Sequence, residues 1–299
     1  MAEDEVTIIG AGPAGMAAAI FLHRAGFSPR LLERSGMGGL LRSANWVENY
    51  PGFPDGIAGG DLASLFEIQL RRIGPKVMLD EVRSVKRARG GFQIRSELGR
   101  RVSRVVILAT GTRPSENSLK GAEALQGKLV FGELHELPSS LKGKRVVIIG
   151  GGDAAFDYAL GLKDRGANIV IISRSEPCCL ELLRERTEAV GIEVVIGATP
   201  KAVHRAGKGL ILECDAGASE VEVAGDILLM ACGRVPNIDV LSPELRRGIT
   251  AGKNGLPETR VEGLYLAGDV VRERQRQTGI AVGDGIRAAM LVQEYLRGR

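Results

Sequence analysis

Two glycine-rich turns carry the clearest chemistry in the sequence. Residues 6–34 read VTIIGAGPAGMAAAIFLHRAGFSPRLLER and residues 146–174 read VVIIGGGDAAFDYALGLKDRGANIVIISR, so the two stretches align without a gap. The glycines that their turns share are Gly10 and Gly12 in the first copy and Gly150 and Gly152 in the second. In such a turn the first glycine permits a sharp exit from a strand, and the second lets a pyrophosphate approach the backbone at a helix N-terminus. The repeat therefore predicts two dinucleotide sites.

The two copies end in different residues, and this difference indicates which nucleotide each site prefers. The first copy has Glu33 where a carboxylate grips the 2′-hydroxyl of an adenosine ribose, whereas the second has Ser173, followed by Arg174 and Ser175. A carboxylate ~4 Å from a 2′-phosphate would repel it by up to ~4 kcal/mol at an effective dielectric of about 20. We therefore expect FAD or NAD at the first site. At the second we expect NADP, with NAD as the alternative.

Each glycine turn must be held by the elements around it. Each copy reads as an apolar strand, the turn, a helix with small residues on one side and a second apolar strand, which is a βαβ unit of a parallel sheet. Three further segments complete the first site: the strands RVVILATGTRP (104–114) and LYLAGDV (264–270), and a helix after Arg276-Gln277 whose N-terminus could stabilise a reduced flavin. We predict an α/β fold class with two Rossmann-like, FAD- and NAD(P)-binding three-layer domains, one inserted in the other.

The composition excludes several other functions. The 299 residues are 44% hydrophobic and 25% charged with a net charge of +4, and their basic clusters lack interleaved aromatics, so we expect no nucleic-acid partner. No apolar run approaches the ~18 residues of a membrane span, and the acidic N-terminus does not read as a signal peptide. The four cysteines form neither a disulfide framework nor a zinc pattern. We expect a cytoplasmic protein with no membrane partner and no metal.

Several short motifs follow one another along the chain. They are GAGPAG at the first turn, ENYPGF (48–53) after Gly38-Gly39, ATG (109–111), GGGDAA at the second turn, CGRVPN (232–237), and GDV (268–270) followed by Arg276-Gln277. Together they resemble the low-molecular-weight thioredoxin reductases, flavoproteins with two dinucleotide-binding domains, over nearly the whole chain. The resemblance implies an FAD-binding domain made of residues 1–114 plus 243–299, an NAD(P)H-binding domain at 115–242, and a homodimer.

The resemblance also implies which residues line the two cofactors. Those expected to line FAD are Gly10, Gly12, Pro13, Ala14, Gly15, Glu33, Arg34, Gly39, Leu40, Asn49, Val82, Ala109, Thr110, Gly111, Gly268, Asp269, Arg276, Gln277 and Thr278. Those expected to line NAD(P)H are Gly150, Gly152, Asp153, Ala154, Ser173, Arg174, Ser175 and Arg234.

The sequence departs from the family at the redox-active thiols. Thioredoxin reductases place a C-x-x-C pair just before the strand of the second turn, and its thiolate must contact the flavin to relay electrons. Here GELHEL (132–137) holds that place. One interpretation is a solvated loop. The other is a segment in which His135, Glu133 or Glu136 moves a proton to the flavin or shields it, with His135 as the catalytic candidate.

A second departure concerns the NADPH signature. The family has His-Arg-Arg followed by another arginine, whereas this chain has Ser173-Arg174-Ser175, with Cys179 where the last arginine would be. By the repeat, Cys178 and Cys179 lie just past this segment, beside the adenosine end of NAD(P)H. They therefore cannot substitute for the missing thiol pair.

The leading interpretation is an FAD-dependent NAD(P)H oxidoreductase. Hydride would pass from NAD(P)H to the flavin, and electrons would go on to an external acceptor such as ferredoxin, a quinone or another small-molecule or small-protein carrier, without the dithiol relay. Ferredoxin–NADP reductases of the thioredoxin-reductase type also lack the thiols. Two alternatives stay open: a thioredoxin or disulfide reductase that uses non-standard cysteines, and a non-catalytic, NAD(P)H-binding regulatory flavoprotein.

Overall fold

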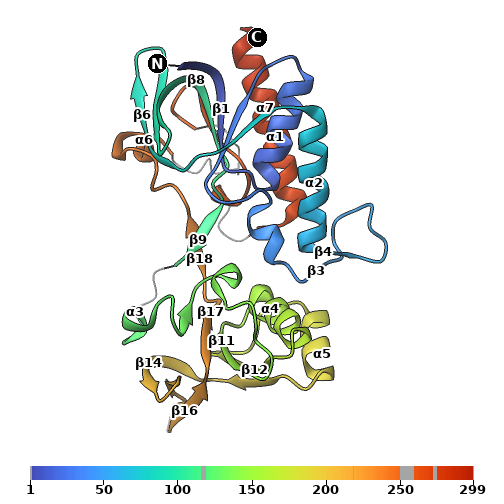
Figure 1. Cartoon of the computed structure of the whole chain (residues 1–299), viewed down its shortest axis with the longest axis vertical. Coiled ribbons are helices and arrows are strands. Elements are labelled where there is room, and N and C mark those ends of the chain that lie inside the picture. The colour runs from blue at the N-terminus through green and yellow to red at the C-terminus, as the bar shows by residue number, and fades with distance from the viewer. Residues whose placement is uncertain (1, 116–118, 218, 250–258, 272–274, 299) are drawn as a thin grey trace. The chain divides into compact units, whose positions relative to one another are not determined.

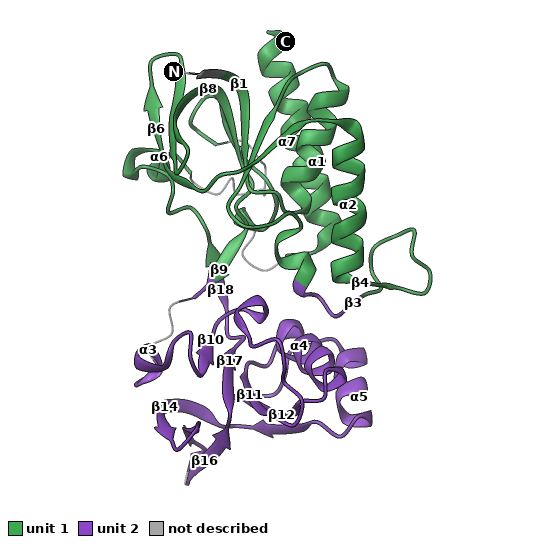
Figure 2. Ribbon diagram, viewed as in Figure 1, with its two compact units in different colours: residues 1–42, 47–113, 235–299 green, residues 43–46, 114–234 purple. Residues whose placement is uncertain are grey.

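The structure, a computed structural model, describes residues 2–115, 119–217, 219–249, 259–271 and 275–298. The chain forms two compact units (Figure 2). Unit 1 comprises residues 1–42, 47–113 and 235–299, and unit 2 comprises residues 43–46 and 114–234. In the sequence, unit 2 is thus inserted in unit 1, as predicted.

Unit 1 is built on a seven-stranded sheet (Figure 1). Its strands run in the order β5 (Lys76–Leu79), β2 (Arg30–Glu33), β1 (Ala2–Ile9), β8 (Gly99–Leu108), β7 (Gly91–Ser96) and β6 (Val82–Ala88), and β19 (Leu264–Leu266) pairs with the end of β8. The pairs among β5, β2, β1, β8 and β19 are parallel, whereas β6, β7 and the start of β8 form an antiparallel meander. The central strands are apolar runs because both of their faces are buried, as Ile8 and Ile107 show on one face and Ile9 and Val106 on the other.

Three long helices pack together in unit 1, namely α1 (Pro13–Arg24), α2 (Gly59–Ile73) and α7 (Thr278–Arg297) (Figure 1). Small residues let α1 and α7 approach closely: a Cβ on Gly285 would overlap the carbonyl oxygen of Ala14. Ala18, Ala288 and Ala289 are fully buried in the same core. This contact holds the N-terminal end of α1, which follows the first glycine turn, against α7.

Unit 2 is built on a five-stranded parallel sheet. Its strands run in the order β10 (Val130–Phe131), β17 (Ile227–Met230), β11 (Arg145–Ile149), β12 (Asn168–Ser173) and β13 (Glu193–Ile196). Helices α4 (Asp153–Asp164) and α5 (Glu181–Ala189) accompany it, and an antiparallel sheet of β14 (Thr199–Ala206), β15 (Gly209–Asp215) and β16 (Glu220–Gly225) completes the unit. The order β17-β11-β12-β13 repeats the order β8-β1-β2-β5 of unit 1. The prediction of two Rossmann-like α/β units is confirmed.

The remaining elements are short. They are η1 (Gly39–Ser43), β3 (Trp46–Val47), β4 (Ile57–Ala58), β9 (Thr112–Pro114), α3 (Ala122–Leu125), η2 (Leu134–Glu136), β18 (Arg234–Pro236), α6 (Pro243–Gly248) and η3 (Gly268–Val270). Strands β9 and β18 pair with each other where the chain passes between the two units.

The end of unit 2 differs from the predicted domain boundary. The sequence places this boundary at residue 242, but unit 2 ends at Arg234. The following residues belong to unit 1 because their backbone pairs with β6: the Val85 N–H donates to the Val240 carbonyl (2.7 Å), and the Ser242 N–H donates to the Val85 carbonyl (2.9 Å). Such pairing leaves no mark in composition. Residues 43–46 also differ, since they cluster with unit 2, where the Asn45 N–H donates to Asp157 Oδ2 at 2.8 Å.

Candidate functional site

The first glycine turn follows β1 and leads into α1. Gly10 has a φ of +102°, and a Cβ there would overlap the carbonyl oxygen of Ala109 at the end of β8. A Cβ on Gly15 would overlap the carbonyl oxygen of Gly10. Gly12 differs from both, because a Cβ there would meet no protein atom within 4 Å. Packing thus requires the first and third glycines, whereas the second borders open space in which a phosphate could approach.

The N-terminus of α1 is suited to an anion. Gly12 is the N-cap residue, no side chain caps the helix, and its first turn contains no acidic residue. The first N–H groups of a helix have no partner within the helix, and the helix dipole places positive charge there. A pyrophosphate at this turn would therefore meet unpaired donors and a favourable field.

Glu33 ends β2 beside this turn and is only 9% exposed. Its Oε2 accepts the Ala11 N–H at 2.7 Å, and its Oε1 accepts the Ser35 N–H at 3.0 Å. The carboxylate is therefore held in one position next to the glycine turn. A carboxylate oxygen has room for a further hydrogen bond, so Glu33 can also accept one from a ribose hydroxyl.

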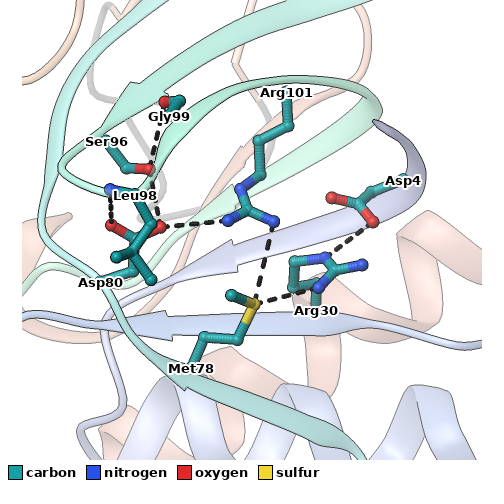
Figure 3. A network of polar contacts seen from close by, with 8 residues as sticks. All are labelled: Asp4, Arg30, Met78, Asp80, Ser96, Leu98, Gly99 and Arg101. Carbon is teal, nitrogen blue, oxygen red and sulfur yellow. Dashed lines mark hydrogen bonds and ion pairs between the residues drawn. The ribbon is translucent and has the colours of Figure 1, made fainter. Parts of the chain in front are cut away.

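Asp80 supports Glu33 at the end of β2, and it is not among the residues predicted from the sequence (Figure 3). Its backbone N–H donates to the Glu33 carbonyl at 2.8 Å, and its side chain is fully buried. Its Oδ2 accepts from Ser96 Oγ (2.6 Å) and Arg101 Nη2 (3.1 Å), and its Oδ1 accepts the Leu98 N–H (3.1 Å). Its partners lie in other segments of the chain, so no motif in the sequence marked it.

The same network extends to the neighbouring strands (Figure 3). Met78 Sδ accepts from Arg30 Nη1 at 3.0 Å and lies 3.8 Å from Arg101 Nη1, and Arg30 forms an ion pair with Asp4 at 2.7 Å. These contacts join β1, β2, β5 and β8 to the loop that leads into Val82. Val82, which is expected to line FAD, is itself buried.

The structure brings most residues expected to line FAD to one edge of the unit 1 sheet. Gly39 approaches Gly12, since a Cβ on Gly39 would lie 3.4 Å from Gly12 Cα. A Cβ on Gly268 would lie 2.8 Å from Ala14 Cβ. Asn49 Nδ2 donates to Gln277 Oε1 at 2.8 Å, although the two residues are far apart in the sequence.

The other residues of this group follow the same strands. Thr110 and Gly111 come directly after β8, and Thr110 Oγ1 donates to the Asn237 carbonyl at 2.6 Å. Asp269 lies in η3 after β19, and Thr278 begins α7, which has neither a side-chain cap nor an acidic first turn. The rest are Pro13, which begins α1, Leu40 and Arg276, which are partly buried, and Arg34, which is exposed.

The second glycine turn repeats this geometry between β11 and α4. Gly150 has a φ of +155°, and a Cβ there would lie 2.6 Å from the carbonyl oxygen of Ala231 at the end of β17. Gly152 is the N-cap of α4, no side chain caps the helix, and a Cβ there would meet nothing within 4 Å. The second turn thus has the same open space at its second shared glycine. Asp153 and Ala154 begin α4 directly beside it.

The strand end beside the second turn carries hydroxyls and a guanidinium. Ser173 is buried, and its Oγ donates to the Ser175 carbonyl at 2.7 Å. Arg174 is exposed and has no hydrogen bond or ion pair among the described residues, so it can meet an anion. The Cys178 N–H donates to the Gly151 carbonyl at 2.7 Å. Cys178 therefore lies beside this turn, where the repeat predicts it.

The segment GELHEL is more than a solvated loop. Glu133 is only 8% exposed, and its Oε1 accepts from Arg234 Nη2 at 2.7 Å. Glu136 Oε2 accepts the N–H groups of Gly132 (3.1 Å) and Glu133 (3.2 Å), so it closes the turn of η2. His135, the predicted catalytic candidate, is exposed on this turn. The residue that sequence reasoning underrated is therefore Glu133.

The four cysteines are all in unit 2, and none forms a disulfide. Cys178 is exposed, Cys179 and Cys232 are partly buried, and Cys214 is buried. Burial raises the pKa of the Cys179 thiol, and the nearby charge of Asp153 adds to this effect. Burial also raises the pKa of Cys214. Since the thiolate is the reactive form, neither environment activates its thiol.

Among the described residues, no group of three or more His, Cys, Asp or Glu side chains could hold a metal ion. Within the same residues, no helix has the length and apolar character that crossing a membrane requires.

Two sheets, each with a glycine turn at the carboxyl edge of its parallel strands and an uncapped helix behind the turn, define a protein with two dinucleotide sites. The chain belongs to the pyridine nucleotide-disulphide oxidoreductase family, whose model matches residues 4–285. It is therefore an oxidoreductase, and the predicted resemblance to thioredoxin reductases is confirmed.

Curated and solved relatives extend over the whole chain. The thioredoxin reductase of Eremothecium gossypii is 30% identical over 321 residues, which cover 99% of each chain. The crystal structure of T. acidophilum thioredoxin reductase is 30% identical with a TM-score of 0.88 and covers 99% of each chain. The structure of Lactococcus lactis thioredoxin reductase is 25% identical with a TM-score of 0.89 and covers 99% of this chain and 100% of that one. The thioredoxin reductase family uses FAD and NADPH.

Proposed function

We propose that this chain is an FAD-dependent NADPH oxidoreductase that passes electrons to an external acceptor without a thiol pair. The observation that carries the proposal is the segment before β11. Glu133 there is buried in an ion pair with Arg234, and Glu136 closes a turn. Both side chains have structural contacts and neither can exchange disulfides. The four cysteines lie at other places in unit 2.

The residues of the first turn fit FAD. The open space at Gly12 and the uncapped N-terminus of α1 would hold the pyrophosphate. Glu33 would bind the adenosine ribose through its 2′-hydroxyl, and its fixed negative charge would exclude a 2′-phosphate. The uncapped N-terminus of α7 adds a second positive helix end in unit 1. When bound, FAD would accept a hydride equivalent from NADPH and supply the electrons that leave the protein.

The residues of the second turn fit NADPH. Gly152 and the uncapped N-terminus of α4 would hold its pyrophosphate. Arg174 lies at the strand end, where a 2′-phosphate would lie, and its guanidinium has no partner among the residues that the structure describes. A guanidinium binds phosphate through charge-assisted hydrogen bonds. No carboxylate takes the place that Glu33 has in the first copy.

The acceptor in this proposal is ferredoxin, a quinone or another small-molecule or small-protein carrier. We also propose a homodimer, which the resemblance to thioredoxin reductases supports, and a reducing compartment such as the cytoplasm, which the lack of a disulfide framework supports.

An anaerobic titration tests the missing thiol relay. The purified yellow protein is titrated with NADPH while the flavin absorbance is followed. We expect a single equivalent of NADPH per FAD to bleach the flavin completely, because no thiol pair takes up further electrons. A second equivalent consumed before full bleaching would indicate a redox-active thiol pair and would contradict the proposal.

A variant and an acceptor screen complete this test. Replacing Cys178, Cys179, Cys214 and Cys232 by alanine should leave NADPH turnover with ferredoxin or a quinone unchanged. Turnover with thioredoxin that disappears in this variant would instead favour a disulfide reductase. Bleaching without repeated turnover on any acceptor would favour a regulatory flavoprotein.

A further inference from the structure

Glu133 has one carboxylate oxygen that the structure leaves without a partner. Its Oε1 accepts from Arg234, but its Oε2 is buried and has no hydrogen-bond partner among the described residues. The whole residue is only 8% exposed. A buried carboxylate oxygen without a donor costs free energy, so a native structure that keeps one has a reason for it. A ligand that brings a donor would remove this cost.

The position of Glu133 in the sheet indicates which ligand group this is. Glu133 follows the carboxyl end of β10, and Arg234 follows the carboxyl end of β17. Both strands run parallel to β11, which ends at the second glycine turn. A dinucleotide lies along this edge with its pyrophosphate at the turn. Because Ser173 and Arg174 place its adenosine on the β12 side, its nicotinamide falls on the side of β17 and β10.

The nicotinamide group supplies the matching donor. Its carboxamide carries an NH2 group with two N–H donors, and an ionised carboxylate only accepts hydrogen bonds. The ion pair with Arg234 favours the ionised form of Glu133 and holds its side chain in place. Hydrogen bonds to a charged acceptor are stronger than those between neutral groups.

We propose that Glu133 is a positioning residue for the cofactor, whose Oε2 accepts a hydrogen bond from the carboxamide NH2 of the nicotinamide. This assignment rests on the proposed function, because it requires NADP to bind at the second turn. It gives the segment that replaces the thiol pair a binding role: the segment orients the nicotinamide ring from its carboxamide side.

Binding of oxidised nucleotides tests the assignment without any turnover. Calorimetric titration of the FAD-loaded protein compares NADP⁺ with 3-acetylpyridine adenine dinucleotide phosphate, in which a methyl group replaces the NH2. We expect the wild type to bind NADP⁺ about tenfold more tightly, the scale of one hydrogen bond to a charged group. In Glu133→Gln the single amide oxygen stays with Arg234 and the NH2 group faces the ligand, so this preference should disappear.

The control is Glu136→Gln, whose amide oxygen can still accept the N–H groups of Gly132 and Glu133. It should keep the tenfold preference for NADP⁺. Circular dichroism during thermal unfolding checks that unit 2 is folded in both variants, and flavin content checks unit 1. The wild-type comparison needs no variant, so it can overturn the proposal even if Glu133→Gln does not fold.

The outcomes separate this assignment from the function on which it rests. Equal affinities of the wild type for both nucleotides would overturn the role of Glu133 while leaving an NADPH oxidoreductase in place. A full tenfold preference retained in folded Glu133→Gln would do the same. A wild type that neither binds NADP⁺ nor is bleached by NADPH would overturn the proposed function, and the role of Glu133 with it.

Discussion

Beside each glycine turn, the end of the second strand accepts the same kind of backbone hydrogen bond, but the side chains there differ between the two units. In unit 1 the Asp80 N–H donates to the Glu33 carbonyl at 2.8 Å, and in unit 2 the Ala198 N–H donates to the Ser173 carbonyl at 3.2 Å. The third strand is therefore tied to the second in the same way in both units. Asp80, however, lies in a buried ionic network, whereas Ala198 is a buried residue without a polar side chain.

This difference matches the different lifetimes of the two bound cofactors. A flavin stays with its enzyme, whereas NADP⁺ must leave in every turnover. Affinity differences between related sites arise mostly in the rate of dissociation. Unit 1 fixes a buried carboxylate by several hydrogen bonds, and unit 2 offers the exposed guanidinium of Arg174 at the equivalent strand end. We infer that the first site is built for retention and the second for exchange.

The largest effect is expected from the buried ionic network around Asp80, because the matching residue of unit 2 is Ala198. Asp80→Asn would leave the buried Arg101 without its ionic partner, and breaking a buried pair in this way costs about 3–5 kcal/mol. Denaturation in urea, followed by circular dichroism and flavin release, measures the loss. Adding Arg101→Met should restore part of the stability, because the uncompensated charge is then removed.

The control for this prediction is Glu97→Gln. It removes one partner of the exposed ion pair between Arg83 and Glu97, in the turn between β7 and β8. Its unfolding midpoint should change little. Equal midpoints for Asp80→Asn and Glu97→Gln would mean that the buried network does not stabilise the adenosine end.

A pair of valine substitutions should separate the two turns. A Cβ at Gly12 or Gly152 meets no protein atom within 4 Å. A valine side chain at either position would therefore extend from its Cβ into the space expected for a phosphate. Gly12→Val should weaken FAD binding at least about tenfold, the scale of one lost hydrogen bond to a charged group, because the new side chain would keep the pyrophosphate from the backbone. Gly152→Val should do the same to NADP⁺ and leave the flavin bound.

Flavin content and NADP⁺ titration of both variants measure this separation. Each variant is the control for the other. Loss of both ligands in either variant would show that the two sites are not independent.

Arg174→Ala should affect the choice between NADPH and NADH. The exposed guanidinium has no other contact among the described residues, so its removal should leave the fold unchanged. We expect the affinity for NADPH to fall about tenfold, the scale of a charge-assisted hydrogen bond, while that for NADH stays the same. Lys163→Ala, in the last turn of α4, is the matched control. A fall in both affinities alike would contradict a contact with the 2′-phosphate.

The smallest effect concerns the thiols beside the second turn. Burial raises the pKa of Cys179, so less of its reactive thiolate is present at neutral pH than for an ordinary thiol. Alkylation of Cys179 should therefore be slow at neutral pH and should still accelerate as the pH rises beyond the usual range of a cysteine. Mass spectrometry of the Cys178→Ser protein at a series of pH values follows it.

A second readout uses Cys178, whose backbone is bonded to Gly151. NADP⁺ should slow the labelling of Cys178 in the Cys179→Ser protein, whereas an excess of FAD should not. Fast labelling of Cys179 at neutral pH would instead reopen a role for this thiol in electron transfer.

The repeat could be read from the sequence because its information is local. Strand, turn and helix follow one another in both copies, and the glycines come at fixed places, so the two Rossmann-like units and the position of Cys178 could be predicted. The boundary at residue 242 could not, because backbone hydrogen bonds between Val85 and residues 240–242 decide it, and such bonds do not depend on side-chain type.

The two acidic residues that matter most were harder to recognise. Asp80 acquires its role only when the turn near Leu98 and the side chain of Arg101 are brought to it by folding. Glu133 lies in a short charged segment that reads as a surface loop, and only its pairing with Arg234, distant in the sequence, buries it. Their partners come from elsewhere in the chain, so periodicity and motif spacing carry no signal for either.

The close packing of Gly285 on Ala14 has a consequence for biosynthesis. Unit 1 is assembled from segments near both ends of the chain, whereas nearly all of unit 2 is one continuous stretch. During translation at about 5–20 residues per second, unit 2 can fold while α7 is still being made. The flavin site of unit 1 can therefore be completed only after α7 has been made, when all of unit 2 already exists.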